Sequence, residues 1–209
     1  SHALYTGHIA EAMVAAVRAE GGSLELSDFA SYKVHERKPL IRTIDGRTIA
    51  TMPAPSAGGM MLLETLSMFG ANKSSALAAG GAGSSATYHM LGEAMRGALA
   101  DRIRLLGDPD LDPHVNDLVE GALAPDQIAA RKSKIDPTKT HKAPEFQTRE
   151  QGTTHLIVAD AEGNVVSLTT TVNAPFGATI VAGDTGIVMN DELDDFSAPK
   201  DVEPFGIEG

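Results

Sequence analysis

The sequence predicts a layered fold that combines α-helices with β-strands, because helical and strand periods of hydrophobicity both occur along it. The longest helical pattern runs from Tyr88 to Leu106. Runs rich in β-branched residues flank Gly-containing breaks and predict β-hairpins over residues 40–52 and 154–172. Apolar stretches such as Leu156–Ala159 indicate strands covered on both faces, which requires further layers of structure.

The helices are expected mainly in the first two thirds of the chain. Apolar positions from Ile9 to Val17 share one helical face, and Gly21-Gly22 supplies a stop signal. A second helix follows the Pro- and Gly-containing stretch 53–59, and a short one follows Pro125. In the longest helix, we expect one apolar stripe to face the core: Tyr88, Leu91, Met95, Leu99, Ile103 and Leu106.

Composition places the 209-residue chain among ordinary globular proteins, with 42% hydrophobic and 22% charged residues. A net charge of −11 argues against binding to nucleic acid or to an anionic membrane surface. The absence of cysteine excludes disulfides, thiolate catalysis and Cys-based zinc sites. No apolar run is long enough to span a bilayer, and the N-terminus carries no signal-peptide pattern.

Two groups of residues invite a metal interpretation, and neither fits one. Asp108, Asp110 and Asp112 are interrupted by prolines and lack the glycine and distal Glu of a calcium loop, which favours a solvated turn. His89 has no metal-ligand partner at suitable spacing, so we expect a structural or solvated role for it. The sequence therefore predicts no metal and no cofactor.

The hairpin over residues 154–172 has a register that its turn can fix. If residues 161–163 form a three-residue loop with Gly163 in the left-handed conformation, Asp160 pairs with Asn164. Counting outward from that pair places Thr153 directly across from Thr171. Directly opposed residues in an antiparallel pair have Cβ atoms about 4.5–5.5 Å apart, so two threonine hydroxyls meet at the open end.

A threonine hydroxyl is a poor nucleophile unless a base lies beside it, and the α-amino group of an N-terminal threonine can be that base. Because Thr153 is internal, this chemistry requires prior cleavage of the Gly152–Thr153 bond. The alternative is an ordinary strand whose threonines are present for their β-propensity. From the residues alone, both interpretations stay open.

The stretch 137–150, just before Thr153, is polar, contains prolines and has no hydrophobic period, so we interpret it as a linker. This position suits a segment that becomes a new C-terminal tail after cleavage. A plain surface connection is the alternative.

Several motifs occur in one order along nearly the whole chain. They are Met52-Pro53-Ala54-Pro55-Ser56-Ala57-Gly58-Gly59, Ala100-Asp101-Arg102, Leu106-Gly107-Asp108-Pro109-Asp110, Thr153-Thr154-His155, Thr171-Val172-Asn173, Gly186-Ile187 and Glu192-x-Asp194-Asp195-Phe196-Ser197. This succession resembles the gamma-glutamyltranspeptidase family of N-terminal-nucleophile hydrolases. Independent motifs in a shared order are far more specific than any single motif.

The resemblance implies an α/β fold, a four-layer αββα sandwich that is incomplete in this chain. Residues 1–152 would be the C-terminal part of the large subunit and residues 153–209 the N-terminal part of the small, catalytic subunit, together one partial domain. The partners would be the remainder of both subunits. Bacterial members are usually periplasmic or secreted, which sets the expected localisation of the full-length protein.

The resemblance also implies a function: gamma-glutamyltranspeptidase or glutathione hydrolase activity. By this resemblance Thr153 attacks the carbonyl of Gly152, becomes the N-terminus of the small subunit, and then attacks γ-glutamyl compounds such as glutathione. The γ-glutamyl group passes to water or to an amino acid. Thr171 would orient or activate the nucleophilic oxygen.

Three more residues match family positions that hold the α-amino end of the γ-glutamyl group: Asn173, Glu192 and Asp195. The chemistry agrees, since a buried ammonium needs carboxylate and amide acceptors. Without the resemblance, Asp194 and Asp195 would be interpreted as surface charge.

Other family features have no match among these residues: an Arg that grips the substrate carboxylate, a Ser pair, and a Gly-Gly pair that supplies oxyanion donors. We therefore expect the 209-residue chain alone to be uncut at Gly152–Thr153 and inactive. Two alternatives remain. One is a cephalosporin or glutaryl acylase of the same family, against which the amine acceptors weigh, and the other is an unprocessed, non-catalytic module.

Overall fold

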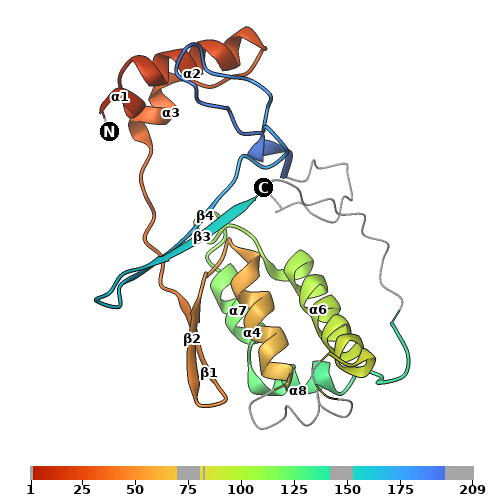
Figure 1. Ribbon diagram of the computed structural model, residues 1–209. Helices are drawn as coiled ribbons and strands as arrows, with labels where there is room; N and C mark the ends of the chain where they lie inside the picture. Colours follow the sequence, from red (N-terminus) through yellow and green to blue (C-terminus); the bar gives the residue numbers. More distant parts are fainter. Residues whose placement is uncertain (1, 70–80, 82, 142–152, 196–209) are drawn as a thin grey trace. The chain divides into compact units, whose positions relative to one another are not determined.

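The computed structural model describes residues 2–69, 81, 83–141 and 153–195 of the chain. The chain divides into two compact units (Figure 1). The first unit combines residues 1–35 with 147–195, and the second combines residues 36–146 with 196–209. In the described ranges, no helix is both long and apolar enough to cross a membrane.

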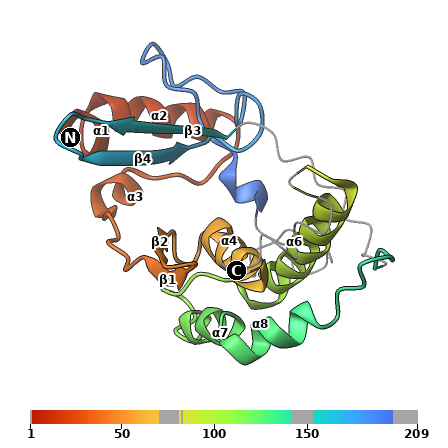
Figure 2. The same cartoon turned by 60° about the horizontal axis from the view of Figure 1, so that its bottom comes forward.

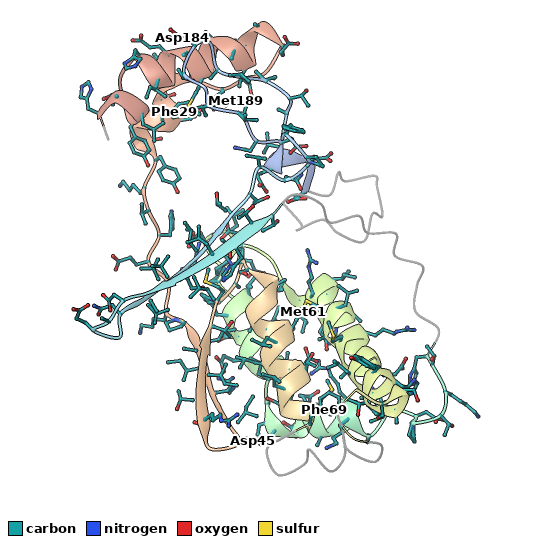
Figure 3. The ribbon with its side chains drawn as sticks, viewed as in Figure 1. Phe29, Asp45, Met61, Phe69, Asp184 and Met189 are labelled. Carbon is teal, nitrogen blue, oxygen red and sulfur yellow. The ribbon has the colours of Figure 1, made fainter. Side chains whose placement is uncertain are left out.

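The second unit opens on a β-hairpin formed by β1 (Leu40–Ile44) and β2 (Arg47–Thr51), which pair antiparallel. Asp45 lies at the tip of this hairpin with a φ of 62° (Figure 3). Gly46 follows with a φ of 73°, and two successive positive φ values are typical of the tight turn that Asp-Gly favours. The predicted hairpin is confirmed.

Within the described residues, the same unit contains four helices: α4 (Ala57–Phe69), α6 (Ser85–Leu105), α7 (Val115–Ala122) and α8 (Pro125–Lys132). α4 packs beside α6 in both ribbon views (Figure 1, Figure 2). The Ser84 hydroxyl caps α6 by accepting a hydrogen bond from the Thr87 backbone N–H at 3.2 Å. Gly59 lets α4 approach the preceding loop, because a Cβ there would lie 1.9 Å from the Met52 carbonyl oxygen.

The apolar core of this unit has two parts. The first contains Leu40, Ala54, Met60, Leu63, Val115, Val119, Ala122 and Leu123. The second, where α4 contacts α6 and α8, contains Met68, Phe69, Ala94 and Ile128. Because the chain holds only six Phe and no Trp, aliphatic side chains and methionines fill most of this core.

The predicted core stripe of α6 is only partly right: Leu91 and Leu106 pack against the two core clusters, but other members of the stripe are exposed. Tyr88 is 66% exposed, and Met95 is 50% exposed. The buried face of α6 instead consists of Glu93, Ala94, Ala98 and Asp101. The two small alanines allow close packing, and the two carboxylates contact arginines of α6 itself as well as His141 and Arg131. The hydrophobic period therefore indicated only part of the face that α6 buries, because it ranks Ala low and acids lowest.

A buried charge network joins α4, α6 and α8. Glu64 of α4 is fully buried, with one carboxylate oxygen 2.9 Å from Arg131 Nε, and Asp101 Oδ2 lies 2.5 Å from the same nitrogen. Burial, together with the neighbouring Asp101, raises the pKa of Glu64 to about 8. Arg131 also donates to the Ala122 carbonyl oxygen at 2.8 Å, so one guanidinium links α8 to α4, α6 and α7.

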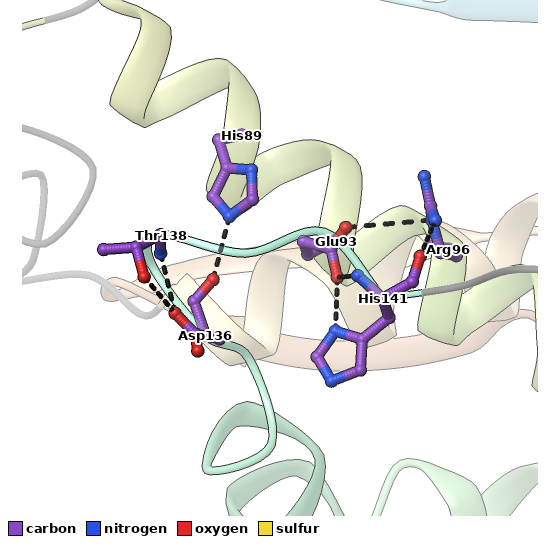
Figure 4. Close-up of polar contacts among 6 residues, drawn as sticks. All are labelled: His89, Glu93, Arg96, Asp136, Thr138 and His141. Carbon is purple, nitrogen blue, oxygen red and sulfur yellow. Dashed lines mark hydrogen bonds and ion pairs between the residues drawn. The ribbon is translucent and has the colours of Figure 1, made fainter.

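Residues 136–141, after α8, are held against α6 (Figure 4). His89 Nε2 contacts the Asp136 carbonyl oxygen at 2.8 Å, which gives His89 the expected structural role. His141 donates its backbone N–H to Glu93 at 3.2 Å, and its Nδ1 lies 2.6 Å from the same carboxylate oxygen. Arg96 donates to the His141 carbonyl oxygen.

Glu93 keeps its charge in this arrangement. Burial alone would raise its pKa, but the hydrogen bonds from His141 and the charge of Arg96 lower the pKa below its ordinary value. The predicted linker is therefore tethered over its described part, and residues 142–150 lie outside the described residues.

The first unit contains α1 (His2–Tyr5), α2 (His8–Ala19) and α3 (Leu26–Ser31). α2 ends as predicted before Gly21, whose φ is 86°. The rings of Tyr5 and Tyr32 stack with centroids 5.9 Å apart.

The same unit contains β3 (Thr154–Ala159), β4 (Val165–Thr170) and the short 3₁₀ helix η2 (Glu192–Asp195). Every residue of β3 and β4 is exposed, so the expectation that these strands are covered on both faces is wrong for the described residues. Ile157 and Val166, for example, are 64% and 62% exposed. The apolar side chains of β3 and β4 predict burial under other elements, and none of the described elements buries them.

Candidate active site

The β3–β4 hairpin has the predicted register. Its pairs run from Thr154↔Thr170 to Ala159↔Val165. The turn also matches, since Gly163 has a φ of 88° and the Asp160 N–H donates to the Asn164 carbonyl oxygen at 3.0 Å. Thr153 and Thr171 are the next residues outward on the two strands, and both are exposed. Gly152, on the other side of the predicted cleavage, lies outside the described residues.

His155 lies on the same face of the hairpin as Thr153, because side chains alternate along a strand. Its Nδ1 is 2.8 Å from the Thr169 hydroxyl oxygen, and its Nε2 is 3.1 Å from the Ser167 hydroxyl oxygen. Both hydroxyls come from β4, so the ring is fixed from the facing strand. The register predicts Thr169 as the partner of His155, but the Ser167 contact was missed. It runs diagonally to β4, and the diagonal spacing on one face could have indicated it.

The segment after β4 turns sharply at Asn173, which has a φ of 68°. In this conformation the Asn173 backbone N–H donates to the Thr171 hydroxyl oxygen at 2.9 Å. The Thr171 oxygen thus accepts from the backbone, and its own O–H is left to donate to another oxygen. That is the property required of a group that orients a neighbouring nucleophile.

The acidic end of the unit is η2. Glu192 Oε1 is buried and has no hydrogen-bond partner among the described residues. Burial, followed by the charge of Asp195 and a hydrogen bond with it, raises the pKa of Glu192. Asp195 is exposed. A buried carboxylate oxygen without a donor is costly, and a bound cation that donates hydrogen bonds would relieve that cost.

Backbone contacts bring the Thr171–Asn173 segment to this acidic turn. The Asn173 side-chain amide donates to the Asp191 carbonyl oxygen at 3.3 Å, and the Asp191 N–H donates to the Val172 carbonyl oxygen at 3.3 Å. Four of the predicted site residues therefore gather in one unit: Thr171, Asn173, Glu192 and Asp195. Thr153 joins them through the hairpin register. Asp191 itself was missed, because nothing in its local sequence distinguishes it from the acids that follow.

The described ranges contain no group of three or more His, Asp or Glu residues placed to hold a metal ion. In the turn considered for calcium, Arg37 lies 3.6 Å from an Asp108 oxygen and 2.5 Å from an Asp110 oxygen. The expected solvated turn is thus an ion-paired one.

Comparison with known proteins finds a family model described as "Gamma-glutamyltranspeptidase" that matches residues 1–209. The chain is 37% identical over 205 residues to "Glutathione hydrolase 2" of Arabidopsis thaliana, covering 94% of the chain and 34% of the relative. It is 34% identical over 212 residues to the "Glutathione hydrolase proenzyme" of Escherichia coli, covering 98% of the chain and 36% of the relative. The chain thus spans about a third of the length of these curated relatives.

Solved structures agree. The gamma-glutamyltranspeptidase of Helicobacter pylori is 32% identical with a TM-score of 0.59, over 71% of this chain and 40% of that one. A cephalosporin acylase from Bacillus halodurans is 23% identical with a TM-score of 0.75, over 99% of this chain and 36% of that one. Both are N-terminal-nucleophile hydrolases with an α/β fold, so the predicted fold class is confirmed.

Proposed function

The chain belongs to the gamma-glutamyltranspeptidase family, and we propose that it performs that family's chemistry at Thr153. The protein cleaves γ-glutamyl amides such as glutathione through a γ-glutamyl-threonine intermediate. It then passes the γ-glutamyl group to water or to an amino acid. The observation that carries this proposal is the register of β3 and β4, which makes Thr153 and Thr171 the next opposed residues at the open end of the hairpin.

Maturation is the first step of the proposal. The Thr153 oxygen attacks the Gly152 carbonyl carbon, the peptide C–N bond breaks, and an ester forms while the nitrogen takes up a proton. Water then hydrolyses the ester. The products are a carboxylate on Gly152 and a free α-amino group on Thr153, which can serve as the base for later turnover.

In turnover, the Thr153 oxygen attacks the γ-carbonyl carbon of the substrate, and the α-amino group takes the hydroxyl proton. The Thr171 O–H donates to the Thr153 oxygen and orients it, since the Asn173 N–H already occupies the Thr171 oxygen as a donor. The leaving amine departs with a proton. Water or an amino acid then attacks the ester carbonyl and regenerates the free hydroxyl.

The substrate's α-ammonium is held by Glu192, Asp195 and Asn173. The buried Glu192 oxygen that lacks a hydrogen-bond partner supports this assignment, because an ammonium supplies three donors and a positive charge. The raised pKa of Glu192 belongs to the same picture: burial and the neighbouring Asp195 disfavour its charged form until a cation arrives.

The wider context is part of the same proposal. Residues 1–152 belong to the large subunit and residues 153–209 to the small one, and the remainder of the two subunits forms the partner surface. A periplasmic or secreted location is proposed for the full-length protein. Full-length here means the complete product of the gene. Cell fractionation followed by immunodetection tests the location.

The decisive experiment replaces Thr153 in the full-length protein. Thr153→Ala is expected to abolish both self-cleavage and release of p-nitroaniline from γ-glutamyl-p-nitroanilide, because the nucleophile is lost. Thr153→Ser retains the hydroxyl and is expected to keep part of both. Thr154→Ala is the matched control, since alternation places that hydroxyl on the other face of β3.

Denaturing electrophoresis reports cleavage as two bands, and absorbance reports turnover. An uncut Thr153→Ala protein with substantial turnover would contradict the proposal. A wild-type protein that stays a single band and is inactive would favour the non-catalytic module. Faster turnover of glutaryl-p-nitroanilide than of γ-glutamyl-p-nitroanilide would favour the acylase.

A further inference from the structure

Asp191 lies at the centre of the contacts that join the two halves of the candidate site. Its side-chain Oδ1 accepts a hydrogen bond from the Ala174 N–H at 3.0 Å. Its backbone N–H donates to Val172, and its carbonyl oxygen accepts from the side-chain amide of Asn173 at 3.3 Å. The same carbonyl oxygen accepts from the Asp194 N–H at 2.9 Å within η2.

These contacts reach both functional segments at once. On one side, Val172, Asn173 and Ala174 are three consecutive residues, and Asn173 is the residue whose N–H holds the Thr171 oxygen. On the other side, Asp191 directly precedes Glu192 and anchors the first turn of η2. Asn173 has a φ of 68°, in the left-handed region that Asn enters more readily than most residues with a side chain, and its contacts with Asp191 hold it there.

We propose that Asp191 is a positioning residue that sets the placement of the Thr171 hydroxyl relative to the carboxylates of Glu192 and Asp195. This inference rests on the proposed function and names a residue whose side chain acts through others rather than on the substrate. The bond from the Ala174 N–H to Asp191 Oδ1 is the one contact in the set that uses the Asp191 side chain, so it is the one that substitution of Asp191 removes directly.

Two variants of Asp191 differ in whether they can keep the hydrogen bond from the Ala174 N–H. Asp191→Asn retains a side-chain oxygen that can accept from the Ala174 N–H but removes the negative charge. Asp191→Ala removes the acceptor and leaves a partly buried N–H without its partner. A positioning role therefore predicts that Asn rescues what Ala loses, whereas a role of the charge predicts that both variants fail.

The test is made in the full-length protein with γ-glutamyl-p-nitroanilide. Asp191→Ala is expected to lower kcat about 10- to 100-fold, because a displacement of about 1 Å in an active site has that cost. Asp191→Asn is expected to keep kcat within about threefold and to raise KM modestly, since one negative charge near the ammonium is lost. Asp184→Ala is the matched control, because Asp184 is an exposed acid of a separate turn in the same unit (Figure 3).

Three results decide the inference. If Asp191→Ala keeps kcat within twofold, or if Asp191→Asn loses as much kcat as Asp191→Ala, Asp191 does not position the site. If Asp191→Ala prevents maturation, the rate of self-cleavage replaces kcat as the quantity compared, with the same rescue expected from Asn. Failure of the proposed function is seen separately, as turnover by uncut Thr153→Ala, and it would remove this inference as well.

Discussion

The β3–β4 hairpin and the helical unit around α6 differ in what fixes them. Every residue of the hairpin strands is exposed, and its register follows from a three-residue turn with Gly163 at a φ of 88°. The α6 helix, in contrast, buries Glu93 and Asp101, which contact His141 and Arg131 from other parts of the chain as well as Arg96 and Arg104 of α6 itself. Local chemistry therefore sets the geometry where we place catalysis, and long-range charge pairing sets the geometry of the helical unit.

The largest loss of stability is expected when Arg131 is replaced. Replacing Arg131 by Met should remove the guanidinium that Glu64 and Asp101 share, leave Asp101 with Arg104 on one side only, and destabilise the helical unit by about 3 kcal/mol. Urea denaturation of the full-length protein measures this loss. Lys134→Met is the matched control, because Lys134 is exposed two residues after α8, and it should change stability by no more than about 0.5 kcal/mol. Equal stability of the two variants would show that the network contributes nothing.

A smaller effect follows from the protonation of Glu64. Its pKa of about 8 in the fold lies above its ordinary value of 4.5, so the folded state binds this proton more tightly than the unfolded state. The stabilisation is complete below the ordinary pKa and is lost as pH rises through the folded pKa. Between these values, stability falls by up to about 1.4 kcal/mol per pH unit.

Glu64→Gln tests that slope, since Gln keeps the shape and can donate to Asp101 without titrating. Unfolding free energies measured at pH 5.5 and 7.5 should fall more for the wild-type protein than for Glu64→Gln. Other titrating groups are common to both proteins, so the difference isolates Glu64. Parallel pH profiles would mean that Glu64 is ionised throughout.

The two regions also differ in how far the sequence reveals them. The register of β3–β4 and the positions of Thr171 and Asn173 after it could be predicted, because turn length and alternation are local rules. The buried face of α6 could not, since Ala94 and Ala98 give weak hydrophobic signals. The burial of Glu93 had no sequence signal either, because its partner His141 lies 48 residues away.

Within the candidate site, the sequence missed the residues that act through contacts rather than through reactive groups. Thr153 and Thr171 were identified from register together with family resemblance, and their roles stay predictions. Asp191 was missed because three of its four hydrogen bonds use its backbone atoms and its side-chain bond spans 17 residues. The apolar pattern of β3 and β4 predicts that these strands are buried, but it does not indicate which element buries them.

The smallest prediction compares one substitution in both regions. Gly163→Ala should destabilise the protein by about 1 kcal/mol, because a φ of 88° strains any residue that carries a Cβ. Gly92→Ala in the middle of α6 should stabilise it by about 0.5–1 kcal/mol, since a Cβ there meets no atom within 4 Å and alanine favours helices. Thermal unfolding of the two variants, with each compared to wild type, gives the signs. The opposite signs follow from the backbone alone, because a Cβ at Gly163 also meets no atom within 4 Å. If Gly163→Ala were neutral, the turn would tolerate another conformation, and the register that aligns Thr153 with Thr171 would need a different support.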